Sequence, residues 1–323
     1  MKNIKNNLTL IVLLMILMLL IAVMFIYLYS ENMKLKQQVN DLRASQPAED
    51  PYTVVLPPQT EPLSEKQTEP EPYIIYDNGT DRFDFPMLQR PVSRLLPSET
   101  KTVTNEGNRR VITDESGKAL TRFGIDVSQH QQVIDWDKVS ESVDFAYIRA
   151  GYRGYETGRI MNDSYFADNF RGAEAAGVDT GVYFFSQAVS AEEAEEEAEY
   201  MLGILSDGGY EPDLPIAFWW DQHPSPGEAA RTDDTDGSTQ TECAKAFTDR
   251  IKSAGYDCVV YTTVNGAFFR YDLDGFDSGL WIADYGDECT FAYEYRFLQY
   301  SQSGIIDGIE DFVDLDVMLI DED

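Results

Sequence analysis

The chain has 323 residues and a formal net charge of −32 at pH 7. A surface this negative repels nucleic acid and anionic lipid, so the charge argues against either of them as a partner. Hydrophobic residues make up 43% of the sequence, and the length allows one domain of about 200 residues plus a substantial non-globular arm.

An uninterrupted apolar run at residues 8–29 is long enough to cross a bilayer as a helix. Tyr27 and Tyr29 lie at its far end, where aromatic side chains are favoured at the membrane interface. No small-x-small cleavage site follows, which favours an uncleaved anchor over a signal peptide. We therefore expect residues 1–30 to form a single-pass anchor in the cell membrane, with the acidic remainder of the chain extracellular.

Three segments separate this run from the main domain. Residues 31–44 carry about one apolar heptad, which predicts a short helical stalk but is too brief to predict oligomerisation. Residues 45–72 are rich in Pro, Glu, Gln and Thr, which predicts a solvated, disordered linker. Residues 73–122 form an N-terminal extension. Its segment FDFPMLQRPVSRLL can pack on the domain, and the stretch after it resembles a short hairpin with an ESGK turn at residues 115–118.

Residues 123–323 alternate between apolar runs and helical patterns. Helices are expected at residues 165–176, 191–205 and 241–254. Apolar runs suited to strands buried on both faces are FGIDVS, FAYIRAG, TGVYFFS, PIAFWW and CVVYTT. Later strand-like runs, GLWIADY, YRFLQYS and VDLDV, lack long helices between them. This order predicts an α/β fold, a flattened TIM-like β/α barrel whose late strands lack outer helices.

Acidic side chains follow several predicted strands, at the end of an α/β barrel where active sites form. These are Asp126, Asp221, Asp284 and either Asp314 or Asp316. Carboxyl groups that meet at one rim raise one another's pKa, so one of them can stay protonated near neutral pH. Glycoside hydrolysis needs such a group to protonate the leaving oxygen. Each acid also has a structural alternative, as a strand-end cap or a loop brace.

The three cysteines, Cys243, Cys258 and Cys289, have no CxxC spacing and no companion histidine cluster, which argues against zinc. Their spacing is compatible with one disulfide or with three free thiols. Proton chemistry on carboxyl groups requires no metal or organic cofactor, and we expect none.

In order and spacing, seven segments of the main domain resemble glycoside hydrolase family 25, the barrel-type lysozymes that cut the glycan of bacterial cell walls. The segments are FGIDVSQHQQVIDW, FAYIRAGYRGY, GVYFFSQA, PIAFWWD, LWIADY, LQYSQSG and VDLDV. The resemblance extends from Phe123 to Ile320 and implies that Asp126 is an active-site aspartate. Together with the aromatic residues near strand ends, it predicts these substrate-binding residues: Tyr183, Gln187, Trp219, Tyr261, Trp281, Gln299, Tyr300 and Asp314.

The sequence departs from family 25 at the family's usual Asp-x-Glu pair. Trp219 stands where the family has an aspartate, and Asp221 stands where it has the glutamate general acid. Asp221 reaches about 1.5 Å less far than glutamate, and a misplacement of that order can cost about a hundredfold in rate. The indole of Trp219 cannot act as a carboxylate, although it can stack on a sugar face.

Two hypotheses about function follow from the sequence. The first is a membrane-anchored lysozyme-like glycosidase that acts on peptidoglycan or a related amino-sugar glycan. Its catalytic carboxyl groups would be Asp126, Asp221 and Asp284, with Asp221 as the proton donor and activity weakened or altered by the substitutions. The second is a catalytically inactive barrel that binds cell-wall glycan through the same cleft.

Overall fold

The computed structural model describes residues 52–55, 73–77, 82–93, 101–220, 230–287 and 289–320. The predicted anchor and stalk and the predicted proton donor Asp221 lie outside these ranges, as does most of the predicted linker. No helix within the described ranges is long and apolar enough to span a membrane.

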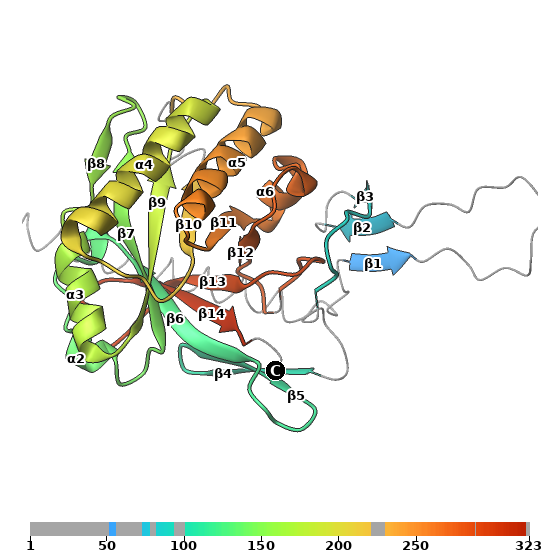
Figure 1. The fold of residues 1–323 in the computed structure, drawn as a ribbon. Coiled ribbons are helices and arrows are strands. Elements are labelled where there is room, and N and C mark those ends of the chain that lie inside the picture. The colour runs from blue at the N-terminus through green and yellow to red at the C-terminus, as the bar shows by residue number, and fades with distance from the viewer. Residues whose placement is uncertain are drawn as a thin grey trace, which may run out of the picture. The chain divides into compact units, whose positions relative to one another are not determined.

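In the described part of the chain, eight strands close into a barrel (Figure 1). β6 pairs with both β7 and β14, which joins the two ends of the sheet. The successive neighbours from β6 through β7 and β9 to β13 are parallel, and β14 is antiparallel to β13 and β6. The barrel strands are β6 (Thr121–Val127), β7 (Phe145–Arg153), β9 (Asp179–Ser186), β10 (Ile216–Trp220), β11 (Cys258–Thr263), β12 (Gly279–Ala283), β13 (Phe297–Gly304) and β14 (Val313–Leu319). A short β8 (Ile160–Asn162) pairs with the end of β7.

The α-helices lie between the early strands. They are α2 (Trp136–Val139), α3 (Phe166–Ala176), α4 (Ala191–Gly208), α5 (Gly237–Ser253) and α6 (Val264–Phe269). Figure 1 shows α4 and α5 running side by side over the outer face of the strands. Between α6 and β14, the only helical element among the described residues is one 3₁₀ turn, Leu273–Gly275. The predicted barrel with late strands that lack outer helices is therefore confirmed.

Local sequence signals explain where these helices begin and end. The Ser190 hydroxyl accepts a hydrogen bond from the Glu193 amide, as expected of an N-cap, and α4 starts directly after it. Gly177 and Gly209 end α3 and α4 in the left-handed conformation, with φ of 76° and 62°. α5 begins four residues before the predicted start because Asp236 caps it through the Thr239 amide.

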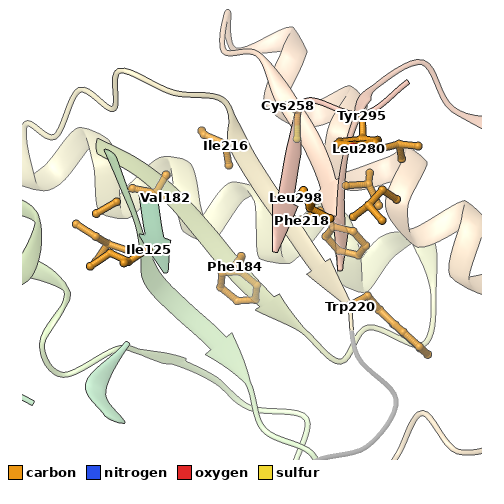
Figure 2. Close-up of a cluster of buried hydrophobic side chains, with 14 of the residues drawn as sticks. Ile125, Val182, Phe184, Ile216, Phe218, Trp220, Cys258, Leu280, Tyr295 and Leu298 are labelled. Atoms are coloured by element: carbon orange, nitrogen blue, oxygen red, sulfur yellow. The ribbon is translucent and has the colours of Figure 1, made fainter. Parts of the chain in front are cut away.

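The barrel strands are buried on both faces. Apolar side chains on the outer face pack against the helices, among them Phe184 and Phe218 (Figure 2). A second cluster fills the interior with rings, among them Tyr147, Trp219 and Trp281. Because successive residues of a strand point to opposite faces, Trp219 enters the barrel between two outward-facing neighbours, Phe218 and Trp220.

The N-terminal extension forms two small antiparallel sheets. The first contains β1 (Tyr52–Val55), β2 (Tyr73–Asp77) and β3 (Arg82–Pro86), and the second contains β4 (Lys101–Glu106) and β5 (Arg109–Asp114). β1 lies inside the predicted disordered linker, so that prediction is wrong for these four residues, which pair with β2.

The predicted hairpin turn at the ESGK segment is confirmed by the antiparallel Thr113–Ala119 bridge across it, and the same stretch forms an additional hairpin, β4–β5. The two residues between β4 and β5, Gly107 and Asn108, form the turn of this additional hairpin, with Gly107 at φ 65°. The ESGK segment makes a second turn that leads into β6. There the Asp114 carboxylate accepts hydrogen bonds from the amides of Ser116 and Lys118.

All three cysteines are free and buried. Of the two arrangements that the sequence allowed, the structure therefore contains three thiols.

Candidate active site

Three carboxyl groups meet where β6 and β14 pair. Asp126 lies near the end of β6 and is the register partner of Asp314 on β14. Asp316 lies two residues beyond Asp314, and so on the same inner face of the barrel. Asp126 and Asp316 are buried, whereas Asp314 is half-buried. The predicted meeting of acids at one rim is thus observed for Asp126 and Asp314, and Asp316 joins them.

A glutamine on β13 organises this cluster. Gln299 Nε2 donates a hydrogen bond of 2.7 Å to Asp126 Oδ2. Its Oε1 accepts hydrogen bonds from the hydroxyls of Tyr261, at 2.9 Å, and Tyr285, at 2.7 Å. Gln299 therefore connects Asp126 with two tyrosines from neighbouring strand ends.

Burial and mutual repulsion favour the protonated forms of these acids. Burial, followed by the nearby Asp314 and Asp316, raises the pKa of Asp126 well above its ordinary value, although the hydrogen bond from Gln299 opposes the shift. Burial and Asp314 likewise raise the pKa of Asp316. Burial raises the pKa of Asp314 to about 6. The cluster therefore retains protons at pH values where isolated carboxyl groups are ionised.

Aromatic rings border the carboxyl cluster. Trp219 stacks on Tyr261 with 3.6 Å between ring centroids, and Tyr183 lies 5.1 Å from Trp219. Trp219 is 7% exposed, and no acceptor among the described residues reaches its Nε1–H. The indole thus fills the space at the end of β10, and Trp281 inside the barrel donates a 2.9 Å hydrogen bond to Asp316.

A cavity of about 590 Å³ opens beside these rings. Trp219, Tyr261 and Tyr285 form part of its lining, so it reaches the two tyrosines that bind Gln299. Its size and its mixture of aromatic and polar side chains are typical of sites for small organic ligands. The cavity lies beside the acid cluster, and glycoside hydrolysis uses a pair of carboxyl groups, one protonated and one ionised, of the kind that the cluster supplies.

The model for glycosyl hydrolases family 25 matches residues 125–309, more than half of the chain. The chain belongs to glycosyl hydrolases family 25. An autolytic lysozyme of Clostridium acetobutylicum is 30% identical over 197 residues, which cover 60% of this chain and 54% of that protein. The uncharacterized protein YegX of Escherichia coli strain K12 is 27% identical over 216 residues, covering 62% and 70% of the two chains.

Solved structures share the fold at low sequence identity. The modular autolysin LytC of Streptococcus pneumoniae, solved with a synthetic peptidoglycan ligand, has a TM-score of 0.54 at 20% identity, covering 76% of this chain and 56% of LytC. The spore cortex lytic enzyme SleM of Clostridium perfringens has a TM-score of 0.52 at 21% identity, covering 62% and 67%. The chain therefore spans little more than half the length of the clostridial lysozyme and of LytC.

Asp284, predicted as a catalytic residue, braces its own loop. Its carboxylate accepts hydrogen bonds from the amide of Gly286 and from both the amide and the hydroxyl of Thr290, the last two at 2.8 and 2.6 Å. The preceding Ala283 belongs to the interior cluster, so strand alternation directs Asp284 away from Asp126. Of its two interpretations, the loop brace agrees with the structure and the catalytic role does not.

Two predicted substrate-binding residues support the barrel instead. The Tyr300 hydroxyl donates a 2.6 Å hydrogen bond to the Asn108 carbonyl, and its ring lies 4.4 Å from the Arg110 guanidinium on the outer side. Gln187 is fully buried and accepts a 3.0 Å hydrogen bond from the Thr232 hydroxyl. Neither side chain is placed to touch a sugar.

The other predicted substrate-binding residues lie together in the barrel: Tyr183, Trp219, Tyr261, Trp281, Gln299 and Asp314.

Sequence reasoning gave no role to Arg149 on β7. Arg149 forms a 2.8 Å ion pair with buried Asp163, and its charge acts on the Tyr183 hydroxyl. The alternation that places Phe145 and Tyr147 inside the barrel extends to Arg149, and this signal was available in the sequence.

Proposed function

We propose that this chain is a glycosidase that hydrolyses peptidoglycan through carboxyl chemistry at the mouth of its barrel. The observation that carries the proposal is the cluster of Asp126, Asp314 and Asp316 beside an aromatic cavity. Family membership supports the reaction class. The substrate is supported by the autolytic lysozyme among its relatives and by the peptidoglycan ligand of LytC.

In this proposal Asp221 protonates the glycosidic oxygen as its bond to the sugar carbon breaks, and water completes the hydrolysis at that carbon. Asp221 directly follows β10 in the sequence. Trp219 supplies no carboxylate, so stabilisation of the developing positive charge falls to the negative charge that the Asp126–Asp314 pair carries once Asp314 ionises above about pH 6. Gln299 orients Asp126 for this role through its 2.7 Å hydrogen bond.

The proposal places the barrel outside the cell membrane. The apolar run at residues 8–29 would anchor the chain, and the polar stretch that follows would hold the barrel near the wall polymer. Fractionation of cells that express the full chain, followed by protease treatment of intact cells, tests this arrangement. Recovery of the chain in the soluble fraction would contradict it.

The test of activity uses the full-length chain in detergent micelles with purified peptidoglycan, and it measures the release of reducing ends. The expected result is release by the wild type and loss of release in Asp126→Asn and Asp221→Asn. Asp168→Asn, on the exposed face of α3, is the matched control and should retain wild-type activity. If the wild type and the variants all bind peptidoglycan but none releases reducing ends, the hydrolase proposal is rejected in favour of an inactive barrel that binds glycan.

A further inference from the structure

The N-terminal extension supplies part of the wall of the cavity beside the acid cluster. Phe83 of β3 lines the cavity together with Trp219 and Tyr261 from the barrel and Phe269 from α6. The family match begins at residue 125, so Phe83 lies outside the part of the chain that the family model covers. This part of the wall is therefore contributed by residues outside the family match.

Aromatic packing holds β2 and β3 against α6. Phe83 meets Phe269 edge-on with 4.9 Å between centroids, and Tyr76 stacks on Phe268 at 5.4 Å. The Tyr76 hydroxyl also donates a 2.9 Å hydrogen bond to Asn265 Oδ1. Because that oxygen is occupied, the Nδ2 group of Asn265, which also lines the cavity, remains a donor for another partner.

Hydrogen bonds from several residues join the chain after β3 to the barrel, and Arg90 makes three of them. Arg90 donates hydrogen bonds to the carbonyls of Leu273, at 2.6 Å, Phe276, at 2.7 Å, and Ser278, at 3.2 Å. Val92 then pairs with Tyr293 as an isolated antiparallel bridge. These contacts fix the position of Phe83 and confirm the predicted packing on the domain for residues 83–93 of that segment.

The cavity has aromatic rings and a hydrogen-bond donor, the two kinds of group that sugar rings bind. Phe83 and Phe269 present aromatic rings, on which the apolar face of a pyranose can stack. The buried Nε1–H of Trp219 has no acceptor among the described residues. A buried donor of this kind is costly unless a partner arrives, and a hydroxyl or amide oxygen of a bound sugar would satisfy it.

In the described part of the chain, the cavity is lined by one positively charged side chain. Arg270 is the only charged side chain among the described residues that line it, although the chain as a whole carries a charge of −32. Arg270 is half-buried, and within the described ranges no carboxylate forms an ion pair with it. A guanidinium binds a carboxylate in bidentate geometry, so the cavity favours a ligand that carries one.

We propose that Phe83, Trp219 and Phe269, with Arg270, form an accessory subsite for a glycan unit that bears a carboxylate. Amino sugars that carry a lactyl or peptide carboxylate have this chemistry. The inference rests on the proposed function, since it assigns the cavity to the same glycan. It adds that Arg270, which directly follows α6, selects carboxylated strands over neutral ones, while Phe83 of the N-terminal extension contributes a contact to both.

The experiment measures binding by calorimetry with the full-length chain in detergent, independently of hydrolysis. The two probes are chitotetraose, which has no carboxylate, and a peptidoglycan-derived disaccharide-tripeptide, which has several. Phe83→Ala and Arg270→Gln are the test variants. Phe312→Ala is the matched control for the first, because Phe312 is exposed and does not line the cavity. Arg250→Gln, on the exposed face of α5, is the control for the second.

The wild type should prefer the carboxylated probe. Phe83→Ala should weaken both probes by about three- to tenfold, the range expected for one aromatic contact. Arg270→Gln should weaken the carboxylated probe by about tenfold and leave chitotetraose unchanged. Both control variants should match the wild type.

Phe83→Leu keeps apolar packing while removing the ring, so it serves if Phe83→Ala unfolds. Equal affinity of the wild type for the two probes, or wild-type binding by Phe83→Leu and Arg270→Gln, would overturn the subsite. Selective binding without any release of reducing ends from peptidoglycan would support the subsite while the proposed hydrolysis fails. The two proposals are thus tested separately.

Discussion

Gln299 fixes Asp126 through one hydrogen bond of 2.7 Å, and two tyrosines determine which end of its amide points there. Tyr261 and Tyr285 both donate to Oε1, which leaves Nε2 directed at the carboxyl group. Gln299 thereby makes three side-chain hydrogen bonds from a side chain with no exposed surface. A glutamine with this many buried partners orients the acid and also stabilises the fold.

We therefore expect Gln299→Leu to lower both activity and stability. The substitution removes the donor to Asp126 and the acceptor of two hydroxyls, and unsatisfied buried groups cost about 1–3 kcal/mol. Urea unfolding and reducing-end release measure the two effects. Gln302→Leu on the same strand is exposed and should leave the free energy of unfolding unchanged. Wild-type stability and activity in Gln299→Leu would refute the orienting role.

The raised pKa of Asp314 predicts how stability changes with pH. Its folded-state pKa of about 6 lies above the ordinary value of 3.8, so the folded protein binds this proton more tightly than the unfolded chain. The resulting stability is present below about pH 4 and is lost as the pH rises through about 6. Asp314→Asn cannot titrate, so its free energy of unfolding should fall less between these values than that of the wild type.

Urea unfolding at about pH 4 and about pH 7 measures this difference. Asp168→Asn, a surface substitution on α3, should follow the wild type at both values. Parallel behaviour of Asp314→Asn and the wild type would show that Asp314 titrates as an ordinary surface acid.

The sequence predicted the barrel because its signals are local. Apolar runs such as FAYIRAG are buried on both faces, and helix caps such as Ser190 bond to their own first turn. The early alternation of strands and helices then leaves few possible topologies. The ESGK turn was predicted from its residues alone, whereas the additional turn at Gly107 and Asn108 was missed although it carries the same kind of local signal.

The site was harder to predict because it depends on contacts between distant strands. Gln299 and Asp126 are 173 positions apart, and nothing local indicates that they bond. Alternation does show which residues share a face, and it places Tyr300 opposite Gln299. It does not show which face is the interior, so Tyr300 and Asp284 were assigned to the cleft by their positions at strand ends.

Trp219 stands where family 25 usually has an aspartate, which suggests restoring the acid. We expect Trp219→Asp to destabilise the protein by at least about 3 kcal/mol, because it removes a buried indole and places a carboxyl group among aromatic rings. Activity should not increase, since the ring stacked on Tyr261 is lost. Thermal unfolding and reducing-end release measure these effects.

Trp219→Phe keeps an apolar ring and should cost less than Trp219→Asp. A stable Trp219→Asp variant that hydrolyses peptidoglycan faster than the wild type would show that the cluster accepts the family's carboxylate. In that case, stabilisation of charge would not depend on Asp126 and Asp314 alone.

A buried ion pair outside the site connects β7 to α4. Arg153 Nε donates to Glu197 Oε1 at 2.6 Å, and the two side chains are 4% and 0% exposed. Burial raises the pKa of Glu197 to about 7, although Arg153 opposes the shift. Arg153→Met leaves this carboxylate without its cation, so it should destabilise the protein by about 3–5 kcal/mol near pH 8.

The loss of unfolding free energy in Arg153→Met should be smaller at about pH 5, because Glu197 is then protonated and carries no charge that needs a cation. The sign follows from the raised pKa: stability is present below the unfolded-state value and is lost as the pH rises through about 7. Urea unfolding at the two pH values gives the difference. Arg250→Met, which breaks an exposed ion pair with Glu199, should have no measurable effect at either pH. An equal loss at both pH values would mean that Arg153 acts through packing and its carbonyl contacts, and not through the charge of Glu197.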